Sequence, residues 1–335
     1  MVAYAVLVLA AAWPLSGAIR SVLPGSAGND TGVYVWNLWV FRYELLVEHH
    51  NPLWTSRILY PGPPIDLALH NYTIFQDALA LGLVPLVGLV GAFNLTWLLM
   101  QALSGLGVFL LARSQTSRDP IAWLAGAMFA CSPTIIARST AHQSLVAAAP
   151  LAFFVWFVLR AADRRTITDA ALAGVCAAWA AICDAYFGIY CAVLLTIVGL
   201  VRLTRWEPEG RQVPRALGTV ITAMMLLPIS IIAMIALTGG RRIDLLGTTI
   251  WMRTLYTPVL VLTVLVLIRI GLALRRRGRW RVDGPIDRFR LIQLVIGVFV
   301  CALLLSPLIN TARLRIQSGG RLQERMLWRS SPPGV

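Results

Sequence analysis

Residues 28–75 read GNDTGVYVWNLWVFRYELLVEHHNPLWTSRILYPGPPIDLALHNYTIF and form the only long stretch in the first half of the chain where polar residues interrupt apolar sequence. The flanking segments are almost entirely apolar. Pro and Gly are frequent in the second half of the stretch and favour turned or extended backbone. We therefore expect residues 20–75 to form a loop between apolar helices, with a helix of its own near its start.

That helix is predicted over about residues 32–48. At 100° per residue, Asn37, Glu44 and Glu48 share one side of it. The opposite arc is apolar and consists of Val33, Trp36, Trp39, Val40, Tyr43, Leu46 and Val47. Trp and Tyr favour the membrane–water interface, although such rings also stack on sugars. The pattern predicts an interfacial amphipathic helix that does not span the membrane.

Asp30 lies directly before this helix, and its position has two interpretations. Asp is a preferred N-cap residue, so Asp30 or Thr31 could satisfy a backbone N–H of the first turn. A lone carboxylate at the water edge of a membrane is also suited to be a catalytic base. The residues alone leave both open.

The composition predicts a membrane protein. The chain has 335 residues, of which 58% are hydrophobic and 13% charged, about half the charged share of a typical soluble domain. Repeated apolar runs near 20 residues long match the roughly 30 Å hydrocarbon core of a bilayer. We expect an all-α, polytopic transmembrane helical bundle over residues 1–309, with about ten membrane segments, and a polar extracytoplasmic tail over residues 310–335.

The basic residues indicate topology. All 29 are Arg, and the net charge is +14. They cluster in four connectors, at 113–118, 160–165, 202–215 and 269–290. Excess Arg in short loops marks the cytoplasmic side and argues against a nucleic-acid-binding face. Arg without Lys suggests a high-GC bacterium, so we expect a multi-pass protein of the inner (plasma) membrane, with the site on the extracytoplasmic side.

Residues 76–93 pose a topological problem. If the first helix, 1–19, leads outward, residues 94–112 must start outside to reach Arg113 on the inside. No full crossing is then left for 76–93, which contains Gly82, Pro85 and Gly88. We expect a broken or re-entrant helix there, because irregular backbone is tolerated at membrane depth when protein surrounds it.

On this topology, several polar or aromatic side chains collect outside the membrane. Arg presents a planar donor fork that suits a lipid phosphate, and a carboxylate in a tight hairpin such as Asp184 is often functional. Solvated loop residues, or a helix cap at Asp184, are the alternatives. The candidate substrate-binding residues are Asp184, Arg138, His142, Arg241, Arg242, Trp36, Tyr60 and His70.

A metal site is less well supported. His49, His50, Asp66 and His70 carry suitable ligand atoms, but their spacing matches no metal-binding motif. We assign no metal ligands, and a divalent metal remains an option. The five Cys lie in or beside apolar runs without a CxxC pair, which is typical of small apolar residues in helices.

Several short motifs follow one another in a recognisable order: GNDTG at 28–32, VWNLW at 35–39, NP at 51–52, YPG with IDLALH at 60–70, SP with IARSTAHQ at 132–143, and CDAYFGIY at 183–190. This order resembles a branch of the GT-C superfamily, polytopic membrane glycosyltransferases that use polyprenyl-phosphate-linked sugars. The resemblance spans roughly residues 20 to 335.

The resemblance implies a catalytic Asp or Glu in the first extracytoplasmic loop, at Asp30. Many relatives have two adjacent acidic residues there, whereas this chain has Asn29 before Asp30. Members of the branch also continue beyond the point where this chain ends, so we expect a C-terminally truncated member. The implied partners are the membrane, a polyprenyl-phosphate-sugar donor and a glycan, lipid or protein acceptor, without nucleic acid. A single displacement would invert the sugar's configuration.

Two other functions stay open. A transporter or lipid-carrier flippase predicts ionisable residues within helices that face a cavity, whereas the charges found above lie at helix ends and in loops. A non-catalytic membrane scaffold predicts that Asp30→Asn has no effect.

Overall fold

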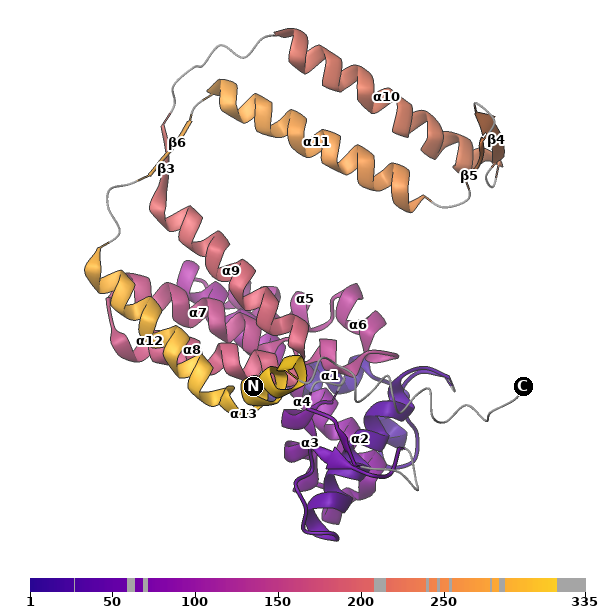
Figure 1. The fold of residues 1–335 in the computed structure, drawn as a ribbon, viewed down its shortest axis with the longest axis vertical. Coiled ribbons are helices and arrows are strands. Elements are labelled where there is room, and N and C mark those ends of the chain that lie inside the picture. The colour runs from indigo at the N-terminus through magenta and orange to yellow at the C-terminus, as the bar shows by residue number, and fades with distance from the viewer. Residues whose placement is uncertain are drawn as a thin grey trace. The chain divides into compact units, whose positions relative to one another are not determined.

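The computed structural model describes residues 1–26, 28–58, 64–68, 72–207, 215–238, 241–245, 248–252, 255–277, 279–282 and 287–317. Helices dominate these ranges, as expected, and the strands are short (Figure 1). Contacts divide the chain into two units: Met1–Gly199 with Ile286–Val335, and Leu200–Pro285. The single transmembrane domain expected over residues 1–309 thus contains two units, and α13 extends into the expected tail.

The first unit holds most of the helices and one small ribbon. Its α-helices are α1 Val2–Ala11, α2 Thr31–Leu46, α3 Ile74–Leu81, α4 Val84–Gln115, α5 Asp119–Ala130, α6 Pro133–Ser139, α7 Ala149–Arg164, α8 Ile167–Cys183, α9 Ala185–Leu203, α12 Arg288–Leu304 and α13 Ser306–Gln317. Its 3-10 helices are η1 Leu15–Ala18 and η2 Gln143–Val146, and its antiparallel strands are β1 Trp54–Thr55 and β2 Ile65–Asp66. Helix α9 continues into the second unit.

Helix α4 is the centre of the first unit and packs against α1, α3, α5 and α7. Small residues let the helices approach closely. A Cβ on Gly126 of α5 would collide with the carbonyl oxygen of Gly105 of α4, and a Cβ on Gly174 of α8 would collide with that of Gly297 of α12. Close backbone contact through small residues is typical of helix packing in membranes.

The helix expected to be broken within 76–93 is interrupted, but it is not a separate segment. Helix α3 ends at Leu81 and α4 begins at Val84. Gly88 then has φ +76° and ψ 174° inside α4, a conformation that glycine adopts without a Cβ clash. Residues 84–115 therefore form one kinked helix, which merges part of 76–93 with 94–112.

Helix α2 occupies nearly the predicted range, but its polar and apolar arcs do not correspond to an exposed and a buried side. Asn37 and Glu44, on its polar arc, are 1% and 4% exposed. The hydroxyl of Thr55 donates to Glu44 Oε1 at 2.6 Å, so strand β1 supplies a partner for the buried carboxylate. Val33 and Leu46, from the apolar arc, are exposed. Part of the polar arc is turned into the protein, and part of the apolar arc is turned outward.

Two of the Arg-rich connectors meet in the first unit. Arg160 lies 3.0 Å from Asp169 at the α7–α8 turn, and Arg165 pairs with Asp287 at the start of α12. Gln293 Nε2 donates to the carbonyl oxygen of Ala161 at 2.8 Å. The connector at 160–165 thus lies beside the start of α12, where the connector at 269–290 ends.

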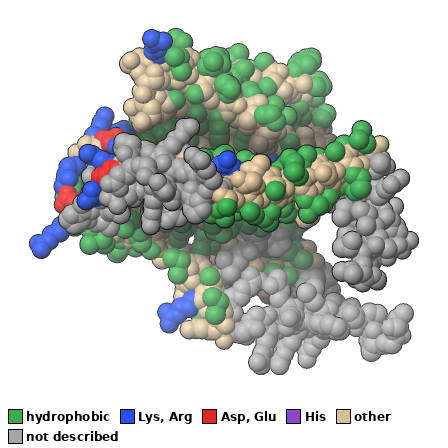
Figure 2. All heavy atoms as spheres, turned by 90° about the horizontal axis from the view of Figure 1, so that it is seen from above, with side chains coloured by type: hydrophobic (Ala, Val, Ile, Leu, Met, Phe, Trp, Pro, Cys, Tyr) green, Lys and Arg blue, Asp and Glu red, His purple; other side chains and the backbone are tan. Residues whose placement is uncertain are grey.

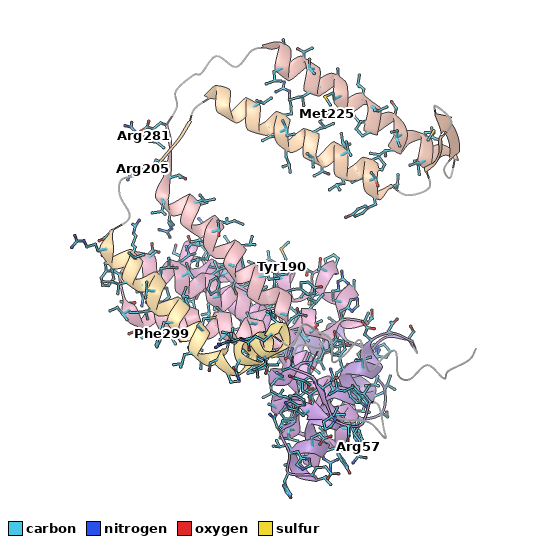
Figure 3. All side chains as sticks on the ribbon, viewed as in Figure 1. Arg57, Tyr190, Arg205, Met225, Arg281 and Phe299 are labelled. Atoms are coloured by element: carbon cyan, nitrogen blue, oxygen red, sulfur yellow. The ribbon has the colours of Figure 1, made fainter. Side chains whose placement is uncertain are left out.

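The second unit is a helical hairpin with two ribbons. Helix α10 Arg215–Thr238 lies beside α11 Tyr256–Arg277, and β4 Arg241–Leu245 pairs antiparallel with β5 Thr248–Met252 at one end of it (Figure 1). Strand β3 Thr204–Glu207 pairs with β6 Arg279–Val282. Arg205 and Arg281 belong to this ribbon, and Met225 lies on α10 (Figure 3).

Within the described residues, six helices are long and apolar enough to cross a membrane: Val84–Gln115, Asp119–Ser139, Gln143–Arg164, Ala185–Leu203, Ala216–Leu237 and Tyr256–Ala273. A seventh arises if Arg288–Leu304 and Ser306–Leu314, bent by 67°, form one span. This is fewer than the expected ten, because Val2–Ala11 and Ile167–Cys183 are shorter and 76–93 is not separate. Hydrophobic side chains are spread over the helices in Figure 2, and Tyr190 and Phe299 are exposed examples in Figure 3.

Candidate functional site

Asp30 begins helix α2 without capping it. Its carbonyl oxygen accepts from the amides of Val33 and Tyr34 at 2.9 and 3.2 Å, which starts the helical ladder. Within the described part of the chain, its side chain makes no cap hydrogen bond. The carboxylate is half exposed. The capping interpretation of Asp30 therefore does not describe this geometry, and the carboxylate is available for another interaction.

That interaction is with His142, in the segment between α6 and η2. His142 Nδ1 lies 3.0 Å from Asp30 Oδ2, a distance at which a protonated imidazole forms an ion pair with the carboxylate. The His142 side chain is 39% exposed and that of Asp30 is 50% exposed, so both are accessible from solvent. The structure thus brings together two residues that the sequence marked independently.

Contacts on both sides of the pair hold the two segments in place. Asn29 Nδ2 donates to the carbonyl oxygen of Thr140 at 2.9 Å. Gln143 Nε2 donates to Thr31 Oγ1 at 3.2 Å. Gly25 has φ +93°, and a Cβ there would collide with the carbonyl oxygen of Thr140. Glycine is therefore required where the loop before α2 meets the segment that carries His142.

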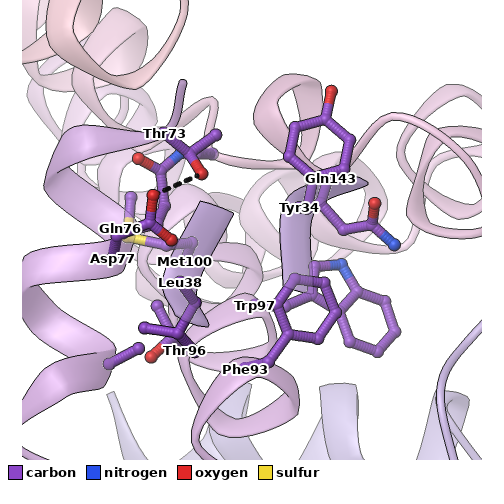
Figure 4. A pocket seen from close by; sticks show the side chains of 12 residues that line it. Tyr34, Leu38, Thr73, Gln76, Asp77, Phe93, Thr96, Trp97, Met100 and Gln143 are labelled. Carbon is purple, nitrogen blue, oxygen red and sulfur yellow. Dashed lines mark hydrogen bonds between the residues drawn. The ribbon is translucent and has the colours of Figure 1, made fainter. Parts of the chain in front are cut away.

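A pocket adjoins the Asp30–His142 pair. It lies between α2, α3, α4 and η2, and its residues are Tyr34, Leu38, Thr73, Gln76, Asp77, Ala80, Phe93, Thr96, Trp97, Met100, Gln143 and Ala147. Figure 4 shows Thr73, Gln76 and Asp77 on one side, and Tyr34, Gln143 and Trp97 on the other. Gln143, which lines the pocket, follows His142 in the chain, and its Nε2 donates to the hydroxyl of Thr31, the residue after Asp30.

Asp77 is the residue of this pocket that the sequence reasoning missed. Its side chain lies inside the protein, with the residue 3% exposed, and Thr73 Oγ1 donates to its Oδ2 at 3.1 Å. Burial raises the pKa of this carboxyl well above its ordinary range, and the hydrogen bond from Thr73 opposes this only in part. The signal in the sequence was a carboxylate inside the apolar run QDALALGL at 76–83.

Two of the candidate binding residues have well-defined surroundings. Asp184 Oδ1 accepts the amide of Tyr186 at 2.8 Å, so Asp184 acts as a cap at the start of α9, as the structural alternative predicted. Arg138 lies exposed on α6, and its carbonyl oxygen accepts the amide of His142 at 2.7 Å. Among the described residues, the Arg138 guanidinium has no ion-pair partner, so it is available to an anion.

Of the other candidates, Trp36 alone has a described side chain. Trp36 packs against the cluster of Val40, Phe41, Leu67 and Tyr72, away from the pocket lining. Arg241 and Arg242 lie on β4 of the second unit, and their side chains are outside the described part. Tyr60 and His70 fall outside the described residues.

The described residues contain no group of three or more His, Cys, Asp or Glu side chains that could hold a metal ion. His50 Nδ1 instead lies 3.8 Å from Glu44 Oε2, and Asp66 Oδ1 accepts the amide of Ala68 at 2.8 Å. His70, which belongs to the same group of metal candidates, lies outside the described residues.

Comparison with known proteins adds a family but no activity. A family model described as Domain of unknown function (DUF6311) matches residues 78–248, from within α3 to within β5. No curated protein and no solved structure matches the chain. The matched region covers just over half of the 335 residues and includes His142, Gln143 and most of the pocket. The chain therefore belongs to the family described as Domain of unknown function (DUF6311).

Proposed function

We propose that the chain is a membrane glycosyltransferase that moves a sugar from a polyprenyl-phosphate carrier to an acceptor hydroxyl on the extracytoplasmic side. The observation that carries this proposal is the Asp30 carboxylate, which is exposed, does not cap its helix, and lies 3.0 Å from His142. The motif order described above adds the resemblance to the GT-C superfamily.

In the proposed reaction, the acceptor hydroxyl oxygen attacks the anomeric carbon of the donor sugar. The bond between that carbon and the phosphate oxygen breaks, and its electron pair leaves with the lipid phosphate. The Asp30 carboxylate takes the hydroxyl proton, which is the work of a general base. His142 positions this carboxylate. One displacement at the anomeric carbon inverts its configuration.

The departing lipid phosphate gains negative charge, which a cation must stabilise. Arg138 is suited to this role because its guanidinium is exposed and has no ion-pair partner among the described residues. It precedes His142 by one helical turn, and its planar fork can bind two phosphate oxygens at once. We assign Arg138 to the donor phosphate.

The test is the pool of polyprenyl-phosphate sugars in lipid extracts, measured by mass spectrometry. The strains to compare are a deletion strain and the same strain restored with wild type, Asp30→Asn or Asp119→Asn at equal expression. Asp119 is the matched control, because it is an exposed carboxylate paired with Arg113 at 2.8 Å, and exposed pairs of this kind contribute little.

We expect one sugar-lipid to accumulate in the deletion and Asp30→Asn strains, and to return to its normal level with wild type and Asp119→Asn. If Asp30→Asn restores the pool as well as wild type does, Asp30 is not the base. A pool that never changes among the strains refutes the transferase and favours transport or a scaffold.

The second candidate is a proton-coupled flippase or transporter, and Asp77 is the observation that favours it. A buried ionisable side chain that faces a cavity is typical of transport proteins, and Asp77 fits this description. The measurement is translocation of an NBD-labelled polyprenyl phosphate in proteoliposomes, read by dithionite quenching. A flippase predicts translocation that depends on a pH gradient and is lost in Asp77→Asn, whereas a transferase predicts neither.

A further inference from the structure

The pocket beside the Asp30–His142 pair concentrates polar atoms that lack a partner. Gln76 Oε1, Thr96 Oγ1, Trp97 Nε1 and Gln143 Oε1 are buried and have no hydrogen-bond partner among the described residues. Thr96, Trp97 and Gln143 are 3%, 7% and 7% exposed. Buried polar groups are nearly always paired in native proteins, and unpaired ones destabilise the fold. Four of them around one cavity indicate a site that binds a polar ligand.

Contacts elsewhere in the protein fix which atoms the pocket offers. Gln76 Nε2 donates to the carbonyl oxygen of Cys183 at 3.4 Å, and Gln143 Nε2 donates to that of Ser139 at 3.1 Å. Both amides therefore keep their oxygen atoms as free acceptors. The Trp97 N–H is a free donor. The pocket thus presents donors and acceptors together.

This mixture fits a hydroxyl group, which donates one hydrogen bond and accepts others. An anion would meet the free oxygen atoms of the two Gln residues and the Asp77 carboxyl. The volume of about 20 Å³ is room for roughly one such group. Tyr34, Phe93 and Trp97 supply aromatic surface to the same pocket, and aromatic walls with a few placed polar groups are typical of small-molecule sites.

We infer that this pocket is a subsite that binds one hydroxyl or hydroxymethyl group of a sugar ring and so selects the sugar. The inference rests on the proposed function, because it names the part of that site that recognises the carbohydrate. One contact links the pocket to the Asp30–His142 pair: Gln143 follows His142, and its Nε2 also donates to Thr31, the residue after Asp30. On this inference, a sugar held by the pocket has the proposed base within reach.

The experiment is saturation-transfer difference NMR on the full chain in lipid nanodiscs. The probes are free D-glucose, D-galactose, D-mannose and D-arabinose, each added separately. Thr96→Val removes one hydroxyl from the pocket without changing the side chain's shape. Thr196→Val is the matched control, because Thr196 is exposed on α9 and donates to the carbonyl oxygen of Ala192 at 2.9 Å. Trp97→Phe is the second test variant and removes an N–H donor.

We expect saturation transfer to at least one of the four sugars with wild type, Thr196→Val and Asp30→Asn. The affinity should fall by about 2- to 12-fold in Thr96→Val, the loss expected for one hydrogen bond, and also in Trp97→Phe. No transfer to any of the four sugars, or equal transfer in wild type and both pocket variants, overturns the inference.

This experiment and the lipid-pool test together distinguish failure of the subsite from failure of the proposed function. Sugar binding that depends on Thr96, together with a pool that is the same in all strains, keeps the subsite and refutes the transferase. A pool that depends on Asp30, together with no sugar binding in the pocket, supports the transferase and overturns the subsite. Loss of transfer in Asp30→Asn but not in Thr96→Val places the sugar at the Asp30–His142 pair and overturns the subsite.

Discussion

Replacing Gly25 with Ala should move the loop that carries Asp30 away from the segment that carries His142, without altering any side chain of the candidate site. Gly25 lies in the loop before α2, at φ +93°, against the carbonyl oxygen of Thr140. A methyl group there collides with that oxygen, so the loop and the segment at 139–146 must move apart. The Asn29–Thr140 hydrogen bond is then lost, and Asp30 loses its position against His142.

The magnitude follows from two contributions. An Ala residue at positive φ costs about 1–2 kcal/mol relative to glycine. Loss of the hydrogen bond from Asn29 to Thr140 costs about 0.5–1.5 kcal/mol. Together they weaken the docking of the two segments by about 1.5–3.5 kcal/mol, which corresponds to an equilibrium constant for opening that is about 10- to 300-fold larger.

The assay is hydrogen–deuterium exchange with mass spectrometry, on protein in nanodiscs, read in the peptide that covers residues 139–146. Two glycines provide controls. Gly28 also has a positive φ, +103°, but a Cβ there meets nothing within 4 Å, so Gly28→Ala adds strain without the collision. Gly32 lies inside α2 and is equally unobstructed, so Gly32→Ala should leave the exchange unchanged.

We expect much faster exchange at 139–146 in Gly25→Ala than in Gly28→Ala, and loss of the proposed transfer activity in Gly25→Ala. Equal exchange in these two variants would mean that backbone strain, not the contact with Thr140, controls docking. Unchanged exchange in Gly25→Ala would refute the docked arrangement itself.

Three further predictions concern the surroundings. Thr96→Val removes an unpaired buried hydroxyl, so in scanning fluorimetry without sugar the melting temperature should rise by the equivalent of about 1 kcal/mol; a fall would mean that the hydroxyl has a partner. Gly174→Ala should destabilise the protein by about 1–3 kcal/mol, because the new Cβ collides with the carbonyl oxygen of Gly297; an unchanged melting temperature would contradict the close packing of α8 on α12. The hydrogen bond from Tyr43 holds the pKa of Glu48 below its ordinary value. A lowered pKa stabilises the fold above the unfolded pKa, and this stabilisation is lost as the pH falls through the folded value. Tyr43→Phe should therefore raise the pKa of Glu48, measured by carbon-13 NMR of the carboxyl, and a pKa that stays low would contradict the assigned cause.

Composition and periodicity predict the helical, membrane-spanning character of the chain, but not the number of spans. An apolar run shows that its residues avoid water and does not say whether lipid or protein surrounds them. The run at 76–93 illustrates this: it contains Asp77, which is buried against Thr73, and its second half continues into α4. The break itself was predictable, because Gly82 and Gly88 interrupt the run.

Helix α2 shows where periodicity stops being informative. The period placed the helix within two residues of its ends. It could not say which arc faces the protein, because that depends on partners distant in the chain. Glu44 is buried because Thr55, eleven residues later, donates to it. In a membrane protein an apolar arc can face lipid, so the usual inference from polarity to exposure fails.

The candidate site likewise depends on contacts between residues that are distant in the chain, which the sequence does not reveal. Asp30 and His142 were each marked by their place at a predicted membrane edge, but nothing local pairs residues that lie 112 positions apart. The contact of Asn29 with Thr140 is another that the sequence does not reveal. In the sequence it is a departure from the paired acidic residues of the GT-C resemblance. In the structure its amide N–H donates to the carbonyl oxygen of Thr140. An ionised carboxylate has no proton to donate and would repel that carbonyl, so the amide at position 29 suits the way this loop docks on the segment that carries His142.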